Sequence, residues 1–468
     1  MSLHLPLLLA YCVLQVAVGL WIGRRVKTSG DFFVAGRALG PGLLFSTMVA
    51  ANIGAGSTVG AAGLGYRDGI AAWWWVGSAA IGSAILAFTV GPRMRRIAAE
   101  RGLNTVGDFL EHRYGPGVRA AVSAMLWLAT LAILAGQLIA LARVLDVVAG
   151  VPKWAGCLAG GAVMTIYFTA GGLLTSAWVN MVQLVVMLAG FAIALPVVFA
   201  RAGGFAAVAQ ATPGGAYWSL LEGGASGWMY VVFLGPAFII SPGLLQKIYG
   251  ARDDRTVRLG VGGNAVVLLL FAFLPPLLGT AARALHPGLT NHELALPTVL
   301  MMDMPALLGT LGLAAVVSAE ISTADAILFM LATSLSQDLY RRFVNPGASD
   351  GQVLKIARWA AVAGGTAGVA LAIVSPSVID ALSVFYTVLS VSLFVPVVAG
   401  LYVRRVGTPE AATAIAAGVA TLLAAQLGTG GRGWAGLTPA LLGLLAAITA
   451  CAVVAVLRRR PVRSGVPE

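Results

Sequence analysis

A long apolar run in the second half of the chain carries two acids and three hydroxyls within eight residues. The run extends from about Leu307 to Leu335 and is long enough to cross the hydrocarbon layer of a membrane. Within it, residues 318–325 read SAEISTAD. A charged side chain at the centre of a bilayer costs at least about 2.5–3.5 kcal/mol. These polar groups must therefore face a cavity, a partner or an ion.

The composition places this run in an integral membrane protein. Hydrophobic residues make up 59% of the chain and charged residues only 10%, whereas a soluble domain carries about 25% charged residues. We therefore predict an all-α integral membrane fold with about 13 transmembrane helices. The predicted spans are 5–23, 41–65, 70–92, 118–148, 154–170, 177–200, 226–246, 260–282, 304–337, 353–374, 377–403, 410–428 and 436–457.

A second polar stretch interrupts the predicted span 41–65. Residues 50–57 read AANIGAGS, and Gly54 and Gly56 each weaken a helix by roughly 1 kcal/mol relative to Ala. A helix that unwinds here exposes backbone carbonyls, which are tolerated at membrane depth only where they line a cavity or bind something. Together with the Ser322 and Thr323 hydroxyls they would form an all-oxygen cage suited to a hard cation, for which we predict sodium. The alternative is that the hydroxyls bond to their own helix and the glycines serve only close helix packing.

Glycine and proline also interrupt the span 226–246, five helices after the first interrupted span. It contains Gly235-Pro236 and Ser241-Pro242-Gly243. Interrupted segments at matching positions of two halves are typical of an inverted-repeat transporter with its binding site near the midplane. The repeat is inferred here from spacing alone.

The distribution of basic residues predicts the orientation of the chain. The net charge is +12, and alternate connections between the predicted spans hold 24 of the 30 Lys and Arg residues. By the positive-inside rule the N-terminus lies outside and the C-terminus in the cytoplasm, in a cell (inner) membrane. The positive charge then reflects topology and contact with the lipid bilayer, and no nucleic-acid partner is expected. Residues 5–23 lack a cleavage site and are predicted to be a retained helix.

Polar and aromatic residues beside the first interruption are candidate solute ligands. We expect the solute near Asn52, Gly54, Gly56 and Ser57. The run Trp73-Trp74-Trp75 opens the next span; tryptophan there usually marks the membrane interface, and Trp74 is the ring chosen as a wall of the solute pocket. Glu320 is a further candidate, as a charge for a cationic solute group, a proton site or a salt-bridge partner.

Several motifs together resemble the sodium:solute symporter family. They are STAD at 322–325 continuing to QDLY at 337–340, DFFVAGR at 31–37, the stretch 50–66, AWVNMVQ at 177–183, and LQK at 245–247. The resemblance implies the ten-helix LeuT fold in spans two to eleven, a 5+5 inverted repeat with alternating access coupled to sodium. The implied divisions are 1–25 (extra N-terminal helix), 38–200 (first repeat), 225–404 (second repeat), 405–458 (two peripheral helices) and 459–468 (cytoplasmic tail).

The same resemblance implies the ligands of the main sodium site. They are the backbone oxygens of Ala50, Ile53 and Ala319 and the hydroxyls of Ser322 and Thr323. The hydroxyls and unwound carbonyls are the groups already indicated by the residues themselves.

Two departures from the family pattern carry information. Many members have Asp where this chain has Asn180, and in some that Asp is tied to a second sodium; a second sodium is therefore less expected here, although Asp325 keeps one acid in the region. Sugar transporters place Glu and Gln where this chain has Gly56 and Ser57, which argues against a galactose-like solute.

We therefore expect a sodium-coupled symporter importing a small polar organic solute, with amino acids or organic acids favoured. A proton-coupled transporter using Glu320 or Asp325 is the first alternative, and a membrane sensor or receptor the second; neither a passive channel nor an enzyme is expected, and no obligate protein partner is evident. One sodium suffices energetically. A charge crossing about 100 mV supplies about 2.3 kcal/mol and a tenfold gradient about 1.4, enough for several-hundred-fold accumulation of a neutral solute.

Overall fold

A computed structural model describes residues 3–23, 37–169, 173–222 and 227–458. In these ranges the chain forms helices and no β-strand, only two isolated bridges. The first half comprises α1 (His4–Gly23), α3 (Pro41–Asn52), η2 (Gly56–Gly60), α4 (Ala61–Asp68), η3 (Gly69–Ala72), α5 (Trp73–Ile85), η4 (Leu86–Val90), α6 (Gly91–Arg101), α7 (Val106–Tyr114), α8 (Pro116–Ala149), α9 (Lys153–Thr169), α10 (Leu173–Arg201), α11 (Phe205–Ala211) and η5 (Gly215–Trp218).

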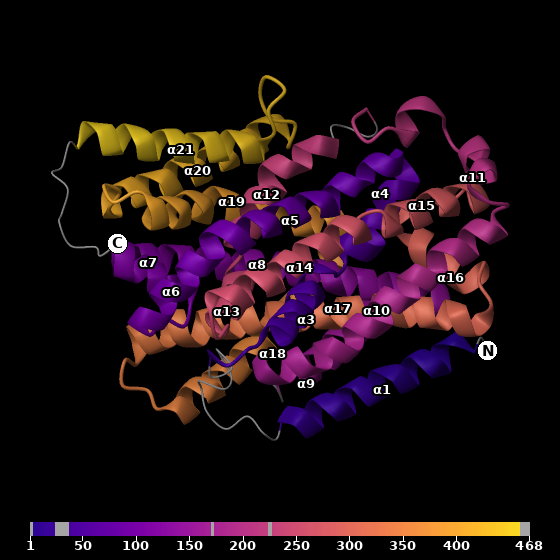
Figure 1. Cartoon of the computed structure of the whole chain (residues 1–468), viewed down its shortest axis with the longest axis horizontal. Coiled ribbons are helices and arrows are strands. Elements are labelled where there is room, and N and C mark those ends of the chain that lie inside the picture. The colour runs from indigo at the N-terminus through magenta and orange to yellow at the C-terminus, as the bar shows by residue number, and fades with distance from the viewer. Residues whose placement is uncertain (1–2, 24–36, 170–172, 223–226, 459–468) are drawn as a thin grey trace.

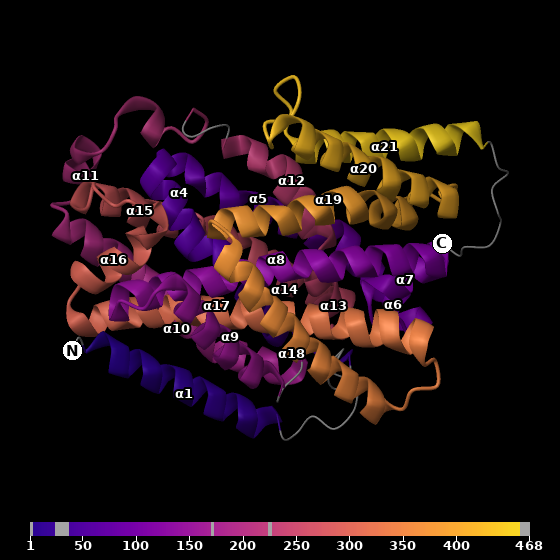
Figure 2. The same ribbon diagram turned by 180° about the vertical axis from the view of Figure 1, so that it is seen from behind.

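The second half continues the same helical bundle. It comprises η6 (Gly227–Met229), α12 (Tyr230–Ile240), α13 (Pro242–Tyr249), α14 (Asp254–Phe271), α15 (Leu274–Leu285), η7 (His292–Leu294), α16 (Ala295–Met302), α17 (Ala306–Thr333), η8 (Ser334–Val344), α18 (Asp350–Val374), α19 (Val378–Tyr402), α20 (Thr408–Thr429) and α21 (Pro439–Leu457). The long helices run roughly along one common direction (Figures 1 and 2).

Membrane-spanning helices dominate the bundle, as the composition predicted. Ten helical runs among the described residues are long and apolar enough to cross a membrane. One of them, Gly56–Arg101, includes the end of the predicted span 41–65 and all of the predicted span 70–92. The number of thirteen therefore stays a prediction. Helix α1 begins at the end of the bundle where α11 and α16 lie, and α21 ends at the opposite end, which also holds α6 and α7 (Figure 1).

Helix α17, which carries the acids and hydroxyls, is the centre of the bundle. In the most apolar stretch of the run Ala306–Val344, which contains α17, 94% of the residues are buried inside the protein. The same share is 33% for α20 and 28% for α21. Helices α20 and α21 pack on each other and on α19 at one edge, while α1 packs on α17, α10 and α9 at another (Figure 2). The polar groups of α17 therefore face protein and cannot reach lipid or bulk water.

Both predicted interruptions are present. Helix α3 ends at Asn52, Ile53 has an extended backbone (φ −101°, ψ 99°), and a π-helical turn begins at Gly56. Helix α12 ends at Ile240, and Ser241 (φ −52°, ψ 122°) leads into α13, whose first residue Pro242 has no N–H to continue the ladder. The other proline of this span, Pro236, stays inside α12.

Some predicted features lie outside the described residues. They are residues 31–36 of the DFFVAGR motif and the tail 459–468. The division into two five-helix repeats stays a prediction.

Candidate functional site

Five oxygen atoms of α3 and α17 converge where α3 unwinds. The Ser322 hydroxyl lies 2.9 Å from the Ala50 carbonyl oxygen and 3.1 Å from that of Ala319. The Thr323 hydroxyl lies 3.0 Å from the Ala50 oxygen and 3.1 Å from that of Ile53. All five residues are buried. The structure thus brings the five predicted sodium-ligand oxygens together.

The chemistry of these oxygens fits a hard monovalent cation. All five are neutral, and each hydroxyl has a single hydrogen shared between two acceptors, so its oxygen can turn a lone pair toward an ion. The alternative reading, in which hydroxyls bond only to their own helix, describes Thr333 and Ser336, which donate to Phe329 and Ala332. Ser322 and Thr323 differ because both reach across to α3.

Gly54 permits this close approach of α3 and α17. A Cβ atom at Gly54 would lie 2.5 Å from the Thr323 hydroxyl oxygen and 2.6 Å from Oε1 of Gln137. Gln137 Oε1 in turn accepts a hydrogen bond of 2.8 Å from the Ala55 N–H, which the helix break leaves without a helical partner. Gln137 therefore satisfies the interrupted backbone. A lone glutamine in an apolar span was the signal for this role in the sequence.

A cavity, here called the central cavity, adjoins the five oxygens. It includes the predicted solute residues Asn52, Gly54, Gly56 and Ser57, and Thr323 belongs both to it and to the oxygen cage. The remaining lining residues are Ala51, Trp75, Ala79, Gln137, Leu234, Phe238, Leu382 and Tyr386. None of these lining residues is charged. A solute here would meet hydroxyls, amides and aromatic rings beside the cation site.

Three hydrogen-bond donors on the lining residues have no partner among the described residues. They are the Trp75 indole N–H, the Gln137 amide NH₂ and the Tyr386 hydroxyl. By contrast, Asn52 donates to the Asn264 side chain (3.1 Å), and Ser57 donates to the Asn52 carbonyl (2.8 Å). The unsatisfied donors suit a solute that presents acceptor oxygens.

Two predicted solute residues lie outside the central cavity. The Trp74 indole N–H donates to the Leu220 carbonyl at 2.7 Å, and the neighbouring Trp75 occupies the wall instead. This corrects the choice of Trp74, since successive helical residues point about 100° apart. Glu320 is fully buried and accepts a hydrogen bond of 2.7 Å from Thr58, and it forms no salt bridge among the described residues. It is held by the η2 turn and does not face the cavity.

Asn180 and Asp325 lie in a separate buried region. The Asn180 amide contacts the Thr47 hydroxyl oxygen at 3.4 Å, and the Lys247 ammonium donates to the same oxygen at 2.9 Å. Asp325 is 4% exposed and lies close enough for its charge to act on Lys247. The sequence indicated the acid and the amide, but not this lysine.

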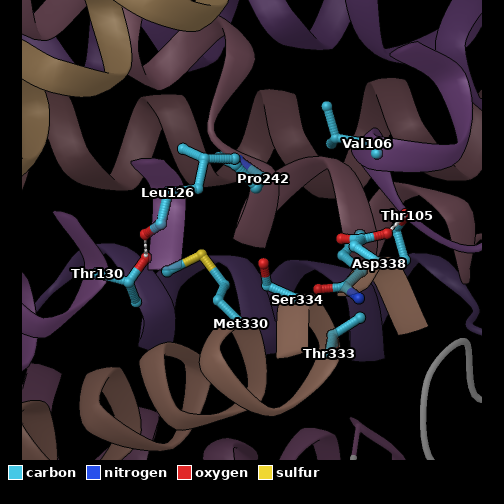
Figure 3. A pocket seen from close by; sticks show the side chains of 11 residues that line it. Thr105, Val106, Leu126, Thr130, Pro242, Met330, Thr333, Ser334 and Asp338 are labelled. Carbon is cyan, nitrogen blue, oxygen red and sulfur yellow. Dashed lines mark hydrogen bonds between the residues drawn. The ribbon is translucent and has the colours of Figure 1, made fainter. Parts of the chain in front are cut away.

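Two further cavities continue from the central one. The first, here called the middle cavity, shares Asn52, Phe238, Thr323 and Tyr386 with it and extends to Met330. The second, here called the gate cavity, begins at Met330 (Figure 3). Its lining is Thr105, Val106, Gly107, Leu126, Thr130, Pro242, Gln246, Met330, Thr333, Ser334 and Asp338. The three cavities trace a route from the central cavity toward α7.

An ion-pair cluster closes the gate cavity at its far side. Arg119, only 7% exposed, lies 2.8 Å from Asp108, 2.9 Å from Glu111 and 2.8 Å from Asp338. Thr105 also donates to Asp338, at 2.5 Å, and the two residues lie together on one side of the cavity in Figure 3. The cluster ties α7 and α8 to η8, the π-helical segment that follows α17.

Glu111, on the short helix α7, shows the strength of this cluster. Burial alone would raise its pKa, but hydrogen bonds from Arg342 and Arg119, together with their charges, hold the pKa below its usual value. The ionised form of Glu111 is therefore the one that the folded chain stabilises.

We expect Arg119→Met to destabilise the protein by about 3–5 kcal/mol, because it leaves partly buried acids without their central counter-charge. The measurement is thermal unfolding of the purified protein in detergent. Arg101→Met is the matched control, since Arg101 is exposed and has no ion pair among the described residues. Equal melting temperatures of the two variants would contradict the role of Arg119.

Spanning helices with two interruptions beside a cavity that polar and aromatic residues line are typical of a secondary transporter. The sequence model of the sodium:solute symporter family matches residues 32–418, and the chain belongs to this family. The family consists of transporters, so the predictions of family, LeuT-type fold and absence of an enzyme activity are confirmed.

Individual relatives support the same assignment. The sodium/glucose cotransporter of Vibrio parahaemolyticus is 25% identical over 395 residues, covering 75% of this chain and 71% of its own length. The sodium/pantothenate symporter of Escherichia coli is 27% identical over 354 residues, covering 71% of each. The solved structure of a Na⁺-coupled sialic acid symporter, in a substrate-bound outward-open state, covers 98% of both chains with a TM-score of 0.82 at 18% identity. The named solutes of these relatives differ, so the family alone does not name the solute.

Proposed function

We propose that this chain imports a small polar organic solute together with sodium by alternating access. The observation that carries the proposal is the convergence of five neutral oxygens from α3 and α17, with Thr323 common to this cage and the central cavity. A cation held there joins the broken helix to α17 and shapes the cavity wall. Sodium and solute would then bind cooperatively, because each completes part of the other's site.

The solute class that we favour carries a carboxylate, as amino acids and small organic acids do. The central cavity offers the unpartnered donors of Trp75, Gln137 and Tyr386 and a neighbouring cation, but no acidic side chain. Sugars are disfavoured because Gly56 has no side chain and Ser57 only a short one. Neither can hydrogen-bond a sugar as the Glu and Gln of the sugar transporters could. The charge distribution supports insertion in a cell membrane with the N-terminus outside, and in that orientation the gate cavity and its Arg119 cluster would face the cytoplasm.

A proton-coupled transporter is the second candidate. One observation favours it: Oε2 of the fully buried Glu320 has no hydrogen-bond partner among the described residues. A carboxyl group in such surroundings is a plausible proton site in a membrane transporter.

The test is tracer uptake into proteoliposomes across a panel of amino acids, organic acids, sugars and nucleobases. Each solute is offered with an inward sodium gradient, an inward proton gradient, or neither. Uptake of a carboxylate solute that requires sodium supports the proposal. Uptake driven by protons and indifferent to sodium contradicts it and favours Glu320.

Two tryptophan variants locate the solute within the same assay. Trp75→Leu is expected to weaken the apparent solute affinity about tenfold or more, since it removes a ring and an N–H from the cavity wall. Trp74→Leu is the matched control because Trp74 lies outside the cavity. Equal affinities of the two variants would place the solute elsewhere.

A further inference from the structure

The outer face of α14 changes from basic to apolar along one row of residues. Positions four apart in a helix lie on the same side of it, and the row consists of Asp254, Arg258, Gly262, Val266 and Leu270. Arg258, Val266 and Leu270 are exposed. Because α14 packs on α3 and α5 through its other side, the row lies on the surface of the bundle, on the face seen in Figure 1.

Helix α6 and the π-helical segment η4 run beside this row. At one end, Asp254 pairs with Arg96 of α6 at 3.1 Å. Two helical turns further on, a Cβ atom at Gly262 would lie 3.4 Å from the ring of Phe88 on η4. Arg258 is midway between these two contacts. It therefore lies where α14 meets α6, at a surface here called the α6–α14 seam.

The basic end of the seam carries more positive charge than the acid in contact with it can balance. Arg95 lies 2.6 Å from Asp254, so two arginines share this carboxylate. Arg255 and Arg258 are exposed and form no ion pair among the described residues. Four guanidinium groups thus surround one carboxylate, and the seam attracts a further anion.

We propose that the α6–α14 seam binds one anionic phospholipid. The phosphate is held by Arg96, Arg255 and Arg258, since guanidinium groups donate paired hydrogen bonds to phosphate oxygens. An acyl chain follows the row past Val266 to Leu270. Residues 258 and 270 are about 18 Å apart along the helix, close to the roughly 15 Å thickness of one hydrocarbon leaflet.

The apolar continuation of the row favours a lipid over a free anion. A soluble phosphate would use the arginines alone, whereas a phospholipid also covers the exposed Val266 and Leu270. Basic sites between helices on the cytoplasmic side are suited to anionic headgroups. In the proposed orientation this end of the bundle faces the cytoplasm.

Helix α18 provides a matched control for general surface charge. Lys355 and Arg358 are exposed, three residues apart, and form no ion pair in the described part of the chain, as is true of Arg255 and Arg258. Helix α18 lies on the face seen in Figure 2, away from the seam. The positive-inside rule accounts for both pairs equally. A bound lipid distinguishes them, because only the α14 pair has the basic row of α6 beside it.

The test counts lipids on the purified full-length protein in detergent by native mass spectrometry. The protein is titrated with dioleoylphosphatidylglycerol and, separately, with dioleoylphosphatidylcholine, which has the same acyl chains but no net charge. The wild type is expected to bind its first phosphatidylglycerol about thirtyfold or more tightly than phosphatidylcholine. Arg255→Gln/Arg258→Gln should lose about thirtyfold of that affinity, the effect of two arginines near an anionic headgroup. Lys355→Gln/Arg358→Gln should bind like the wild type.

Arg96→Gln tests the contribution of the second helix. Asp254 keeps Arg95 as its partner in this variant, so the fold is retained. The affinity for the first phosphatidylglycerol should fall about fivefold or more. Unchanged affinity shows that α6 takes no part, and the seam is then not the site.

Three further results contradict the proposal. The first is a wild type that binds both lipids equally. The second is an equal loss in the α14 and α18 double variants, which indicates general surface charge. The third is binding of inorganic phosphate, at millimolar concentration, by a wild type that has no preference for phosphatidylglycerol, since the ligand is then a free anion. No sodium or solute enters this assay, so its outcome is independent of the proposed function.

Discussion

Ser322→Ala/Thr323→Ala is expected to abolish sodium-dependent uptake. The two hydroxyls are two of the five oxygens in the cage, and they are the only two from side chains. A hydrogen bond or ligand contact to a charged group contributes about 1.5–3 kcal/mol. Loss of both should raise the sodium concentration needed for half-maximal uptake by about a hundredfold or more. Sodium titration of uptake in proteoliposomes measures this shift.

Ser336→Ala is the matched control for this double variant. Ser336 is also buried and follows α17 directly, but its hydroxyl donates to the Ala332 carbonyl of the preceding turn and contacts no part of α3. Its sodium dependence should match the wild type. Thermal unfolding of each protein without sodium checks that the double variant folds. An unchanged sodium titration in a folded double variant would refute the cage assignment.

The break in α3 was predictable from sequence because its cause is local. Gly54 and Gly56 weaken a helix wherever they occur, and the cost of acids in hydrocarbon is a property of the residues themselves. The hydroxyls of Ser322 and Thr323 could likewise be paired with the freed carbonyls, because a membrane interior requires every such group to have a partner. Local chemistry therefore predicted that these hydroxyls meet freed carbonyls, whereas the choice of the Ala50, Ile53 and Ala319 carbonyls came from the resemblance to the family.

The sequence could not predict in the same way which face of a helix points toward the cavity. Three consecutive tryptophans, Trp73 to Trp75, point in three directions, and only the packing of α5 against α12 decides that Trp75 faces the cavity. Similarly, Gly235-Pro236 and Ser241-Pro242 give nearly equal break signals. The structure tolerates Pro236 inside α12 and breaks the chain at Ser241.

The least predictable contacts join residues far apart in the sequence. Gln137 and Thr47 lie within predicted apolar spans, where polar residues are equally typical of helix packing, and Lys247 directly follows the predicted span 226–246. Their roles follow from contacts across 82 residues for Gln137 with Ala55 and 200 residues for Lys247 with Thr47. One sequence contains no signal that links such distant positions.

Gly54→Ala is expected to eliminate sodium binding as completely as the loss of both hydroxyls. The added Cβ would lie 2.5 Å from the Thr323 hydroxyl oxygen and 2.7 Å from its Cβ, closer than real atoms approach. Thr323 has no room to retreat, since it is held against Ala50 and Ile53 within a buried helix. Either α3 and α17 separate or the cage is distorted, and overpacking of this kind typically costs about 1–3 kcal/mol besides.

Gly42→Ala is the control that isolates this steric effect. Gly42 lies on helix α3, which ends two residues before Gly54, and a Cβ at Gly42 meets nothing within 4 Å. The same substitution should therefore stabilise α3 slightly at residue 42, by up to about 1 kcal/mol, and leave sodium binding at the wild-type value. Equilibrium binding of radiolabelled sodium to both variants decides the matter. If Gly54→Ala binds sodium as Gly42→Ala does, the close approach of residue 54 to Thr323 is not what builds the site.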